Sequence, residues 1–112
     1  MERDVQKLND IVVVRLPVNR LEVSIAQDFK NEILKLIEKG HKKIVLDMEN
    51  VRFIDSSGLG CMVSCLKSVG GDGDLKIANP SDSVQKLLKI TKLNRIFNIY
   101  SSTQQAIEEF GQ

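Results

Sequence analysis

The residues of this chain that are best suited to chemistry stand together in one short segment, Asp55-Ser56-Ser57-Gly58. The segment joins a carboxylate to two hydroxyls, and the residues after it carry apolar side chains at helical spacing, beginning with Leu59 and Met62. It is therefore predicted to lie at a helix N-terminus, where backbone N–H groups lack partners within the helix and the dipole presents partial positive charge. An anion placed there would be stabilised.

Residue types alone leave two interpretations of this segment open. In the first, Asp55 or one of the serines caps the helix, while Gly58 and Gly60 permit a tight turn and close packing. In the second, a serine hydroxyl accepts a phosphoryl group supplied by another protein, which adds a charge of about −1.5 to −2. Asp55 would then orient the hydroxyl or an incoming metal, and it would repel the phosphate from its own side.

Catalysis by the chain itself is not expected. A nucleophile elbow needs glycine two residues before its serine, but Ile54 or Asp55 occupies that position, and His41 is the only histidine that could serve as a base. A phosphate-binding loop is excluded because no lysine follows the glycines at the required spacing. The chain is therefore predicted not to be an enzyme, with no catalytic residues and no cofactor.

The elements that must position this segment follow from the hydrophobic pattern. Residues 5–8 and 11–14 predict a β-hairpin, the second strand being a β-branched run. Ser24 and Gln27 have the spacing of a capping box, so a helix is predicted to begin at Ser24. It is predicted to end at Gly40, which supplies a left-handed stop.

The rest of the chain continues to alternate strands with helices. Residues 44–46 form an apolar run without polar alternation, which predicts a central strand covered on both faces. Two further strands are predicted at residues 75–78 and 96–100, and two further helices begin at the capping residues Ser81 and Ser102, the latter in a capping box with Gln105. This order predicts an α/β fold whose mixed sheet is largely parallel, with an N-terminal hairpin and about four helices.

Length and composition limit the function classes. The 112 residues have room for one domain, residues 1–112, and their net charge of +1 gives no general attraction for nucleic acid or anionic membranes. Aromatic residues make up only 4% of the chain, which argues against a base-stacking platform. No apolar run is long enough to span a membrane, and the polar N-terminus is unlike a signal peptide, so a cytoplasmic location is expected.

Two segments together carry a resemblance to a known family. Residues 43–47, followed by residues 51–60, resemble the signature of bacterial anti-sigma factor antagonists of the STAS domain family. The resemblance extends over essentially the full chain, through residues 87–93 to the closing helix. It implies a single STAS-like domain.

The resemblance also implies a mechanism. In this family the unmodified antagonist binds an anti-sigma factor that is also a serine kinase, which frees a sigma factor and so regulates transcription. Phosphorylation reverses this, and a phosphatase restores the active form. The phosphoacceptor would be Ser57, taking the γ-phosphoryl group of ATP held by the kinase. Partner contacts would come from the rest of the loop: Asp55, Ser56, Gly58, Leu59 and Gly60.

One stretch departs from the family pattern. Many relatives carry a Gly-x-Leu-Asp turn after the second strand, where this chain has Asn19-Arg20-Leu21-Glu22. Asn19 is expected to replace glycine at a positive φ, and Glu22 keeps the charge one methylene further out. Asn19, Arg20 and Glu22 are therefore predicted to contact the partner, whose identity the change would affect. The alternative function is a STAS accessory subunit of a transporter or signalling scaffold, with Ser57 unmodified.

Other polar and reactive residues have structural interpretations. Cys61 and Cys65 lack further metal-binding partners nearby, so no metal site is expected and both are interpreted as reduced, buried thiols. His41 is expected to be solvated near a helix end. A basic cluster is interpreted as a solvated helix face, with docking of a kinase as the lesser alternative; it comprises Lys86, Lys89, Lys92 and Arg95.

Overall fold

The structure, a computed structural model, describes residues 4–111. A five-stranded sheet forms its centre, in the strand order β1-β2-β4-β6-β7. The hairpin strands β1 and β2 are antiparallel, and every other neighbouring pair is parallel. The strands span Asp4–Leu8 (β1), Ile11–Arg15 (β2), Lys43–Asp47 (β4), Asp74–Ala78 (β6) and Ile99–Tyr100 (β7). The predicted hairpin, the central strand and the largely parallel sheet are confirmed.

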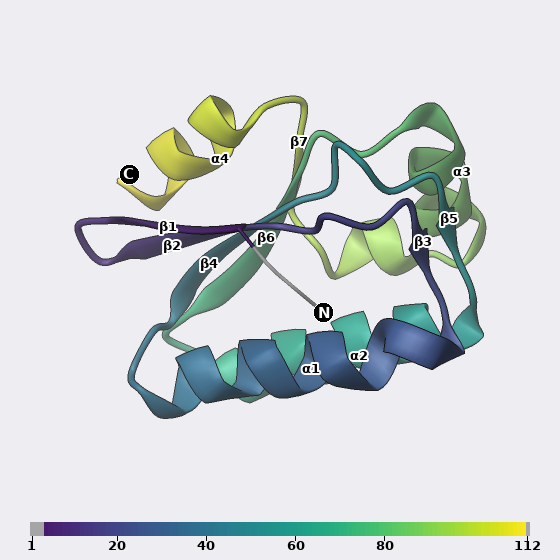
Figure 1. The fold of residues 1–112 in the computed structure, drawn as a ribbon. Helices are drawn as coiled ribbons and strands as arrows, with labels where there is room; N and C mark the ends of the chain where they lie inside the picture. The colour runs from purple at the N-terminus through teal and green to yellow at the C-terminus, as the bar shows by residue number, and fades with distance from the viewer. Residues whose placement is uncertain (1–3, 112) are drawn as a thin grey trace.

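Helices cover both faces of this sheet (Figure 1). α1 (Val23–Glu38) and α2 (Ser56–Val69) lie side by side on one face, and α4 (Thr103–Phe110) lies on the other. α3 (Asp82–Ile90) and the 3-10 turn η1 (Leu93–Arg95) connect β6 to β7. Within the described residues, no helix combines the length and apolar character that a membrane span requires.

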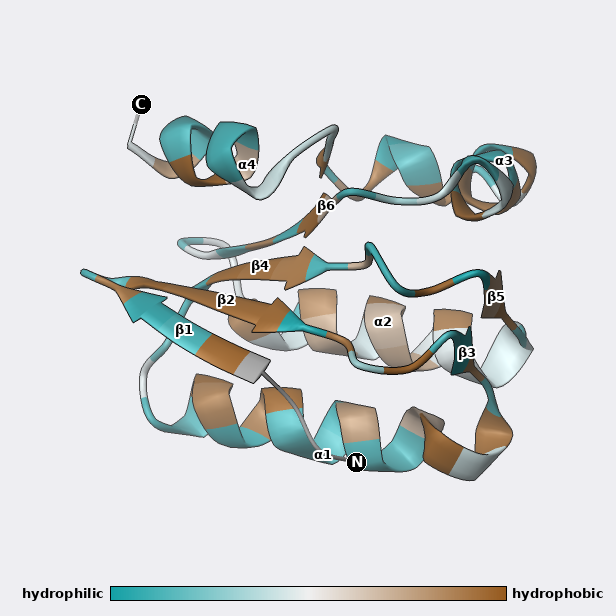
Figure 2. Ribbon diagram, turned by 45° about the horizontal axis from the view of Figure 1, so that its top comes forward, coloured by the Kyte–Doolittle hydropathy of each residue, from teal (hydrophilic) through white to brown (hydrophobic). Residues whose placement is uncertain are grey.

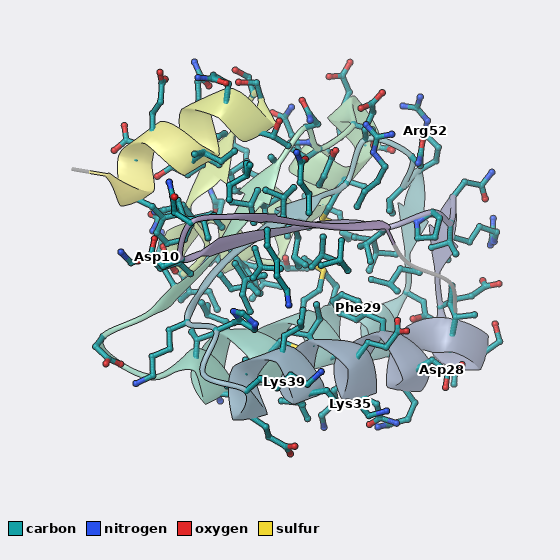
Figure 3. All side chains as sticks on the ribbon, turned by 60° about the vertical axis from the view of Figure 1, so that its left-hand side comes forward. Asp10, Asp28, Phe29, Lys35, Lys39 and Arg52 are labelled. Atoms are coloured by element: carbon teal, nitrogen blue, oxygen red, sulfur yellow. The ribbon has the colours of Figure 1, made fainter. Side chains whose placement is uncertain are left out.

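The apolar run of β2 is buried on both sides because of these two layers. Val12 and Val14 belong to the main core beneath α1 and α2, which Phe29 enters from α1 (Figure 3). Ile11 and Val13 face the opposite way, into a smaller cluster with Ala106 of α4. Alternate side chains of one strand thus fill two apolar layers, and the brown centre of the sheet in Figure 2 reflects this.

A second, two-stranded sheet was not predicted from the sequence. Its strands β3 (Arg20–Leu21) and β5 (Phe53–Ile54) run parallel and extend the connections that leave β2 and β4. Figure 2 shows them beyond the ends of the main sheet, beside the starts of α1 and α2. Two residues per strand are too few to give a recognisable pattern of alternation.

Several local predictions are wrong. α1 begins at Val23 and not at Ser24, and its N-cap residue, Glu22, makes no side-chain cap bond. Asn19 does not have a positive φ; within the described residues the non-glycine residues that do are Asn9, Asn79 and Lys92. The strand predicted at residues 96–100 is confined to Ile99–Tyr100, because the chain first makes the turn η1.

The helix caps predicted at Ser81 and Ser102 are confirmed. The Ser81 hydroxyl accepts the N–H of Val84, and the Ser102 hydroxyl accepts that of Gln105. The second capping box is incomplete, since the Gln105 side chain accepts from Ser101 instead of returning to the N–H of Ser102. Gly40 has a φ of 96° after α1, as its predicted left-handed stop requires.

Candidate functional site

The small β3–β5 sheet brings two separate loops together. Its register pairs residues 20–21 with residues 53–54. One residue earlier, the carbonyl oxygen of Asn19 accepts the N–H groups of Arg52, at 2.8 Å, and Phe53, at 3.1 Å. The stretch that departs from the family pattern therefore lies directly beside the segment that leads into α2.

Asp55 connects the first turns of two helices. It is the N-cap of α2, and its Oδ1 accepts the N–H of Gly58 at 2.8 Å. Its Oδ2 accepts the N–H of Val23, the first residue of α1, at 3.0 Å. One carboxylate thus satisfies a free donor at each helix start, where the partial positive charge of both dipoles favours an anion.

The cap from Asp55 explains why Ser24 does not begin α1. Val23 already has helical geometry, and its N–H is satisfied from another part of the chain. The backbone carbonyl of Glu22 still accepts the helical N–H groups of Ile25 and Ala26. A local capping box is therefore replaced by a long-range bond, which the local sequence pattern does not reveal.

Gly58 fits a position where no other residue would. A Cβ atom there would collide with the carbonyl oxygen of Leu21 and lie 2.8 Å from Cγ2 of Ile54. The expected close packing is therefore confirmed for Gly58. It is wrong for Gly60, where an added Cβ would meet no atom within 4 Å and the residue is exposed.

The two serines start α2 and differ in exposure. Ser56 is exposed, whereas Ser57 is half-buried. The Ser57 hydroxyl makes no hydrogen bond to any residue within 4–111, and Asp55 directs both carboxylate oxygens to backbone N–H groups. Neither carboxylate oxygen of Asp55 is therefore engaged with the Ser57 hydroxyl.

Apolar and cationic side chains lie around this loop. Val23 is 70% exposed and Phe53 is 40% exposed, so both offer apolar area at the surface. The guanidinium of Arg20 lies 4.2 Å from the centre of the Phe53 ring, and its Nε donates to Oε2 of Glu22 at 3.2 Å. Sequence reasoning identified Arg20 and Glu22 but missed Val23 and Phe53, whose exposure depends on the unpredicted β3–β5 pairing.

The predicted partner-binding residues thus come together in space. Asp55 caps α2, residues 56–60 form its first turns, and residues 19–22 lie against the strand connection that leads into it. Leu59 packs partly against the main core, so it supports the turn from within. We refer below to residues 19–23 and 53–60 as the Ser57 surface.

The cysteines lie further along α2, and the burial predicted for both is confirmed for Cys65 and wrong for Cys61. Both are free thiols; Cys65 is buried and Cys61 is half-buried. Burial raises the pKa of the Cys65 thiol to about 12, which keeps it protonated at neutral pH. Among the described residues, no group of His, Cys, Asp and Glu side chains is arranged to hold a metal ion.

Comparison with known proteins places this geometry in a family context. Residues 2–106 match the family model described as the STAS domain. A Thermotoga maritima protein, whose name describes it as a candidate anti-sigma factor antagonist, is 35% identical over 92% of this chain and 93% of its own length. The anti-sigma-B factor antagonist of Staphylococcus aureus is 29% identical over 75% of this chain and 79% of its own length.

A solved structure shows the same fold. The Bacillus cell fate determinant SpoIIAA, determined in its phosphorylated form, superposes with a TM-score of 0.75. The match covers 97% of this chain and 99% of that one, at 21% sequence identity. The order of strands and helices described above is therefore shared with a protein whose sequence has diverged widely.

Proposed function

Because this chain belongs to the STAS domain family and its relatives are anti-sigma factor antagonists, we propose that it binds an anti-sigma factor in its unmodified form and that phosphorylation of Ser57 prevents this binding. The kinase in this proposal is the anti-sigma factor itself, which binds the ATP that donates the phosphoryl group. A phosphatase returns the antagonist to its active form.

The observation that carries the proposal is the state of Ser57. Its half-buried hydroxyl lies in the first turn of α2 and has no hydrogen-bond partner among the described residues, so reaction there breaks no contact. The N-terminus of the helix also tolerates an added anion. Phosphorylation is therefore expected to leave the fold intact while it changes the surface.

The Ser57 surface combines exposed apolar side chains with a site for added negative charge, and one phosphate would therefore act as a switch. Exposed Val23 and Phe53 offer apolar area to a partner, and the N–H of Val23 bonds to the carboxylate of Asp55. A phosphate on Ser57 would add a charge of about −1.5 to −2 beside them, and burying that charge against apolar groups is strongly unfavourable. The partner would dissociate because its apolar contact becomes costly, without a change of fold in the antagonist.

Neighbouring residues have separate roles in this proposal. Asp55 is a positioning residue, since its two cap bonds hold the starts of α1 and α2 against each other. Asn19, Arg20 and Glu22 would contribute to partner choice from the adjacent strand connection. Gly60 leaves the backbone of α2 open to close approach, because nothing in the described chain covers it.

Mass spectrometry can test the assignment of the acceptor. The purified protein is incubated with its anti-sigma factor kinase and ATP, and the modified peptide is sequenced. Phosphate is expected on Ser57 and is expected to persist in a Ser56→Ala variant, which is a matched control one residue away. Modification of Ser56, or full modification of a Ser57→Ala variant, would show that the acceptor is wrongly assigned.

A further inference from the structure

A groove lies on a different part of the molecule, between α3 and the strand β7. It has a volume of about 730 Å³. One wall comes from α3, where residues at helical spacing line it, including Lys86 and Lys89. The other wall consists of the chain that enters and forms β7, residues 97–100. None of the residues proposed for the Ser57 surface lines this groove.

The strand that forms this wall has a free edge. In the part of the chain that the structure describes, β7 has one neighbour, β6. The carbonyl of Asn98 accepts the N–H of Ile77 in β6, and the carbonyl of Tyr100 accepts that of Asn79, the residue after β6. Because hydrogen-bonding groups alternate along a parallel strand, the N–H and C=O of the intervening Ile99 point away from β6. They are available to another extended chain.

The helix wall of the groove carries an excess of positive charge, since Lys86 and Lys89 line it together with the single carboxylate of Asp82. Between residues 82 and 95 the chain has four cations, Lys86, Lys89, Lys92 and Arg95, against the single carboxylate of Asp82. Within residues 4–111, none of these four cations forms an ion pair, in contrast to Lys42 and Lys43, which pair with Asp72 and Asp10. The sequence alone favoured a solvated face; the structure adds a groove beside it.

Apolar area accompanies these charges along the same segment. Ile90 at the end of α3 is 73% exposed, and Ile96 after η1 is 48% exposed. Neither isoleucine lines the groove itself, so they add apolar area only to the surface beside it.

From these observations we propose that the groove binds an acidic, extended segment of a partner protein, which adds a strand to the free edge of β7. Its carboxylates would lie against Lys86 and Lys89, and its backbone would pair with Ile99. Binding of an acidic strand would use both the free hydrogen-bonding edge of β7 and the positive charge of the lysines on α3. An anionic membrane would use the charge but could not reach backbone groups inside a groove.

Fluorescence anisotropy tests the proposal with a defined probe. The probe is a short fluorescein-labelled peptide of alternating glutamate and valine, titrated with the full chain at low salt. Saturable binding is expected, and it should weaken about tenfold or more in a Lys86→Glu/Lys89→Glu variant. The matched control is Lys35→Glu/Lys39→Glu, which reverses two exposed cations near the C-terminal end of α1 (Figure 3), neither of which lines the groove; it should alter the affinity less than about twofold.

Three further measurements distinguish backbone pairing with β7 from electrostatic attraction to the lysines. A probe with lysine in place of glutamate should not bind, and one with proline in place of valine should bind at least about tenfold more weakly, because proline removes the N–H needed for pairing. Equal binding of the proline probe, or equal loss in both double variants, would overturn the proposal. Adsorption of the chain to anionic lipid vesicles without binding of the peptide would overturn it in favour of a membrane surface.

Discussion

Replacing Asp55 with alanine is expected to weaken the starts of two helices at once. The side chain accepts the N–H of Gly58 in α2 and the N–H of Val23 in α1. Loss of a typical N-cap costs about 1 kcal/mol, and the charge of the carboxylate beside each dipole adds about 0.3–1 kcal/mol. The hydrogen bond between Asp55 and the N–H of Val23 is exposed to solvent, so in the variant water would replace part of its contribution to stability. The total is therefore about 2 kcal/mol, a large share of a stability of about 5–15 kcal/mol.

Urea denaturation of Asp55→Ala provides the measurement, with Ser102→Ala as the matched control. Ser102 caps only α4, through one bond of 3.1 Å to the N–H of Gln105. Its loss is expected to cost about 1 kcal/mol. If Asp55→Ala costs no more than Ser102→Ala, the bond across to α1 contributes nothing and the account of Asp55 is wrong.

A double-mutant cycle isolates the bond to α1. Val23 is the first residue of that helix, a position where proline is favoured, and the preceding Glu22 is extended, with φ −132° and ψ 177°, as a residue before proline should be. Val23→Pro thus removes the N–H donor with little other disturbance. In this background Asp55→Ala should cost about 0.5–1 kcal/mol less than in the unmodified chain. An equal cost in both backgrounds would refute the bridging role.

Four further outcomes follow from the same helix. Gly58→Ala should lower the free energy of unfolding by about 1–3 kcal/mol, because the new methyl collides with the carbonyl of Leu21. Gly60→Ala should raise it by about 0.5–1 kcal/mol, since its Cβ meets nothing, and the same denaturation curves check both. Iodoacetamide near pH 8 should label Cys61 before Cys65, as peptide mapping would show. Because the pKa of Cys65 rises from 9.0 to about 12, its contribution to stability should be complete below pH 9.0 and lost between those values.

The sequence correctly predicted those helices and strands whose characteristic residues lie within or next to the element itself. The hairpin, the central strand and the caps at Ser81 and Ser102 are set by residues within a few positions of each other, and all are present in the structure. Gly58 was also correctly assigned to close packing, although its contact is with the distant Leu21. For the hairpin, the central strand and the two caps, the local sequence is sufficient for the prediction, whereas the need for glycine at position 58 comes from a tertiary contact.

Long-range contacts account for the predictions that are wrong. The pattern at Ser24 has the spacing of a capping box, but Asp55 satisfies the start of α1 instead, through a bond to Val23, which lies 32 residues away in sequence. Asn19 was expected to have a positive φ, yet β3–β5 pairing holds its carbonyl as an acceptor for two N–H groups. The exposure of Val23 and Phe53 depends on the same pairing, so the apolar part of the Ser57 surface could not be found from spacing alone.

The central proposal is that charge at Ser57 controls binding to the anti-sigma factor. Isothermal titration of that partner with the unmodified chain, Ser57→Ala and Ser57→Asp tests this most directly, with Ser56→Asp as a control for charge one residue away. Ser57→Ala is expected to bind as the unmodified chain does, and Ser57→Asp at least about tenfold more weakly, because its carboxylate must be buried against apolar contacts. Equal affinities for Ser57→Ala and Ser57→Asp would contradict the proposal.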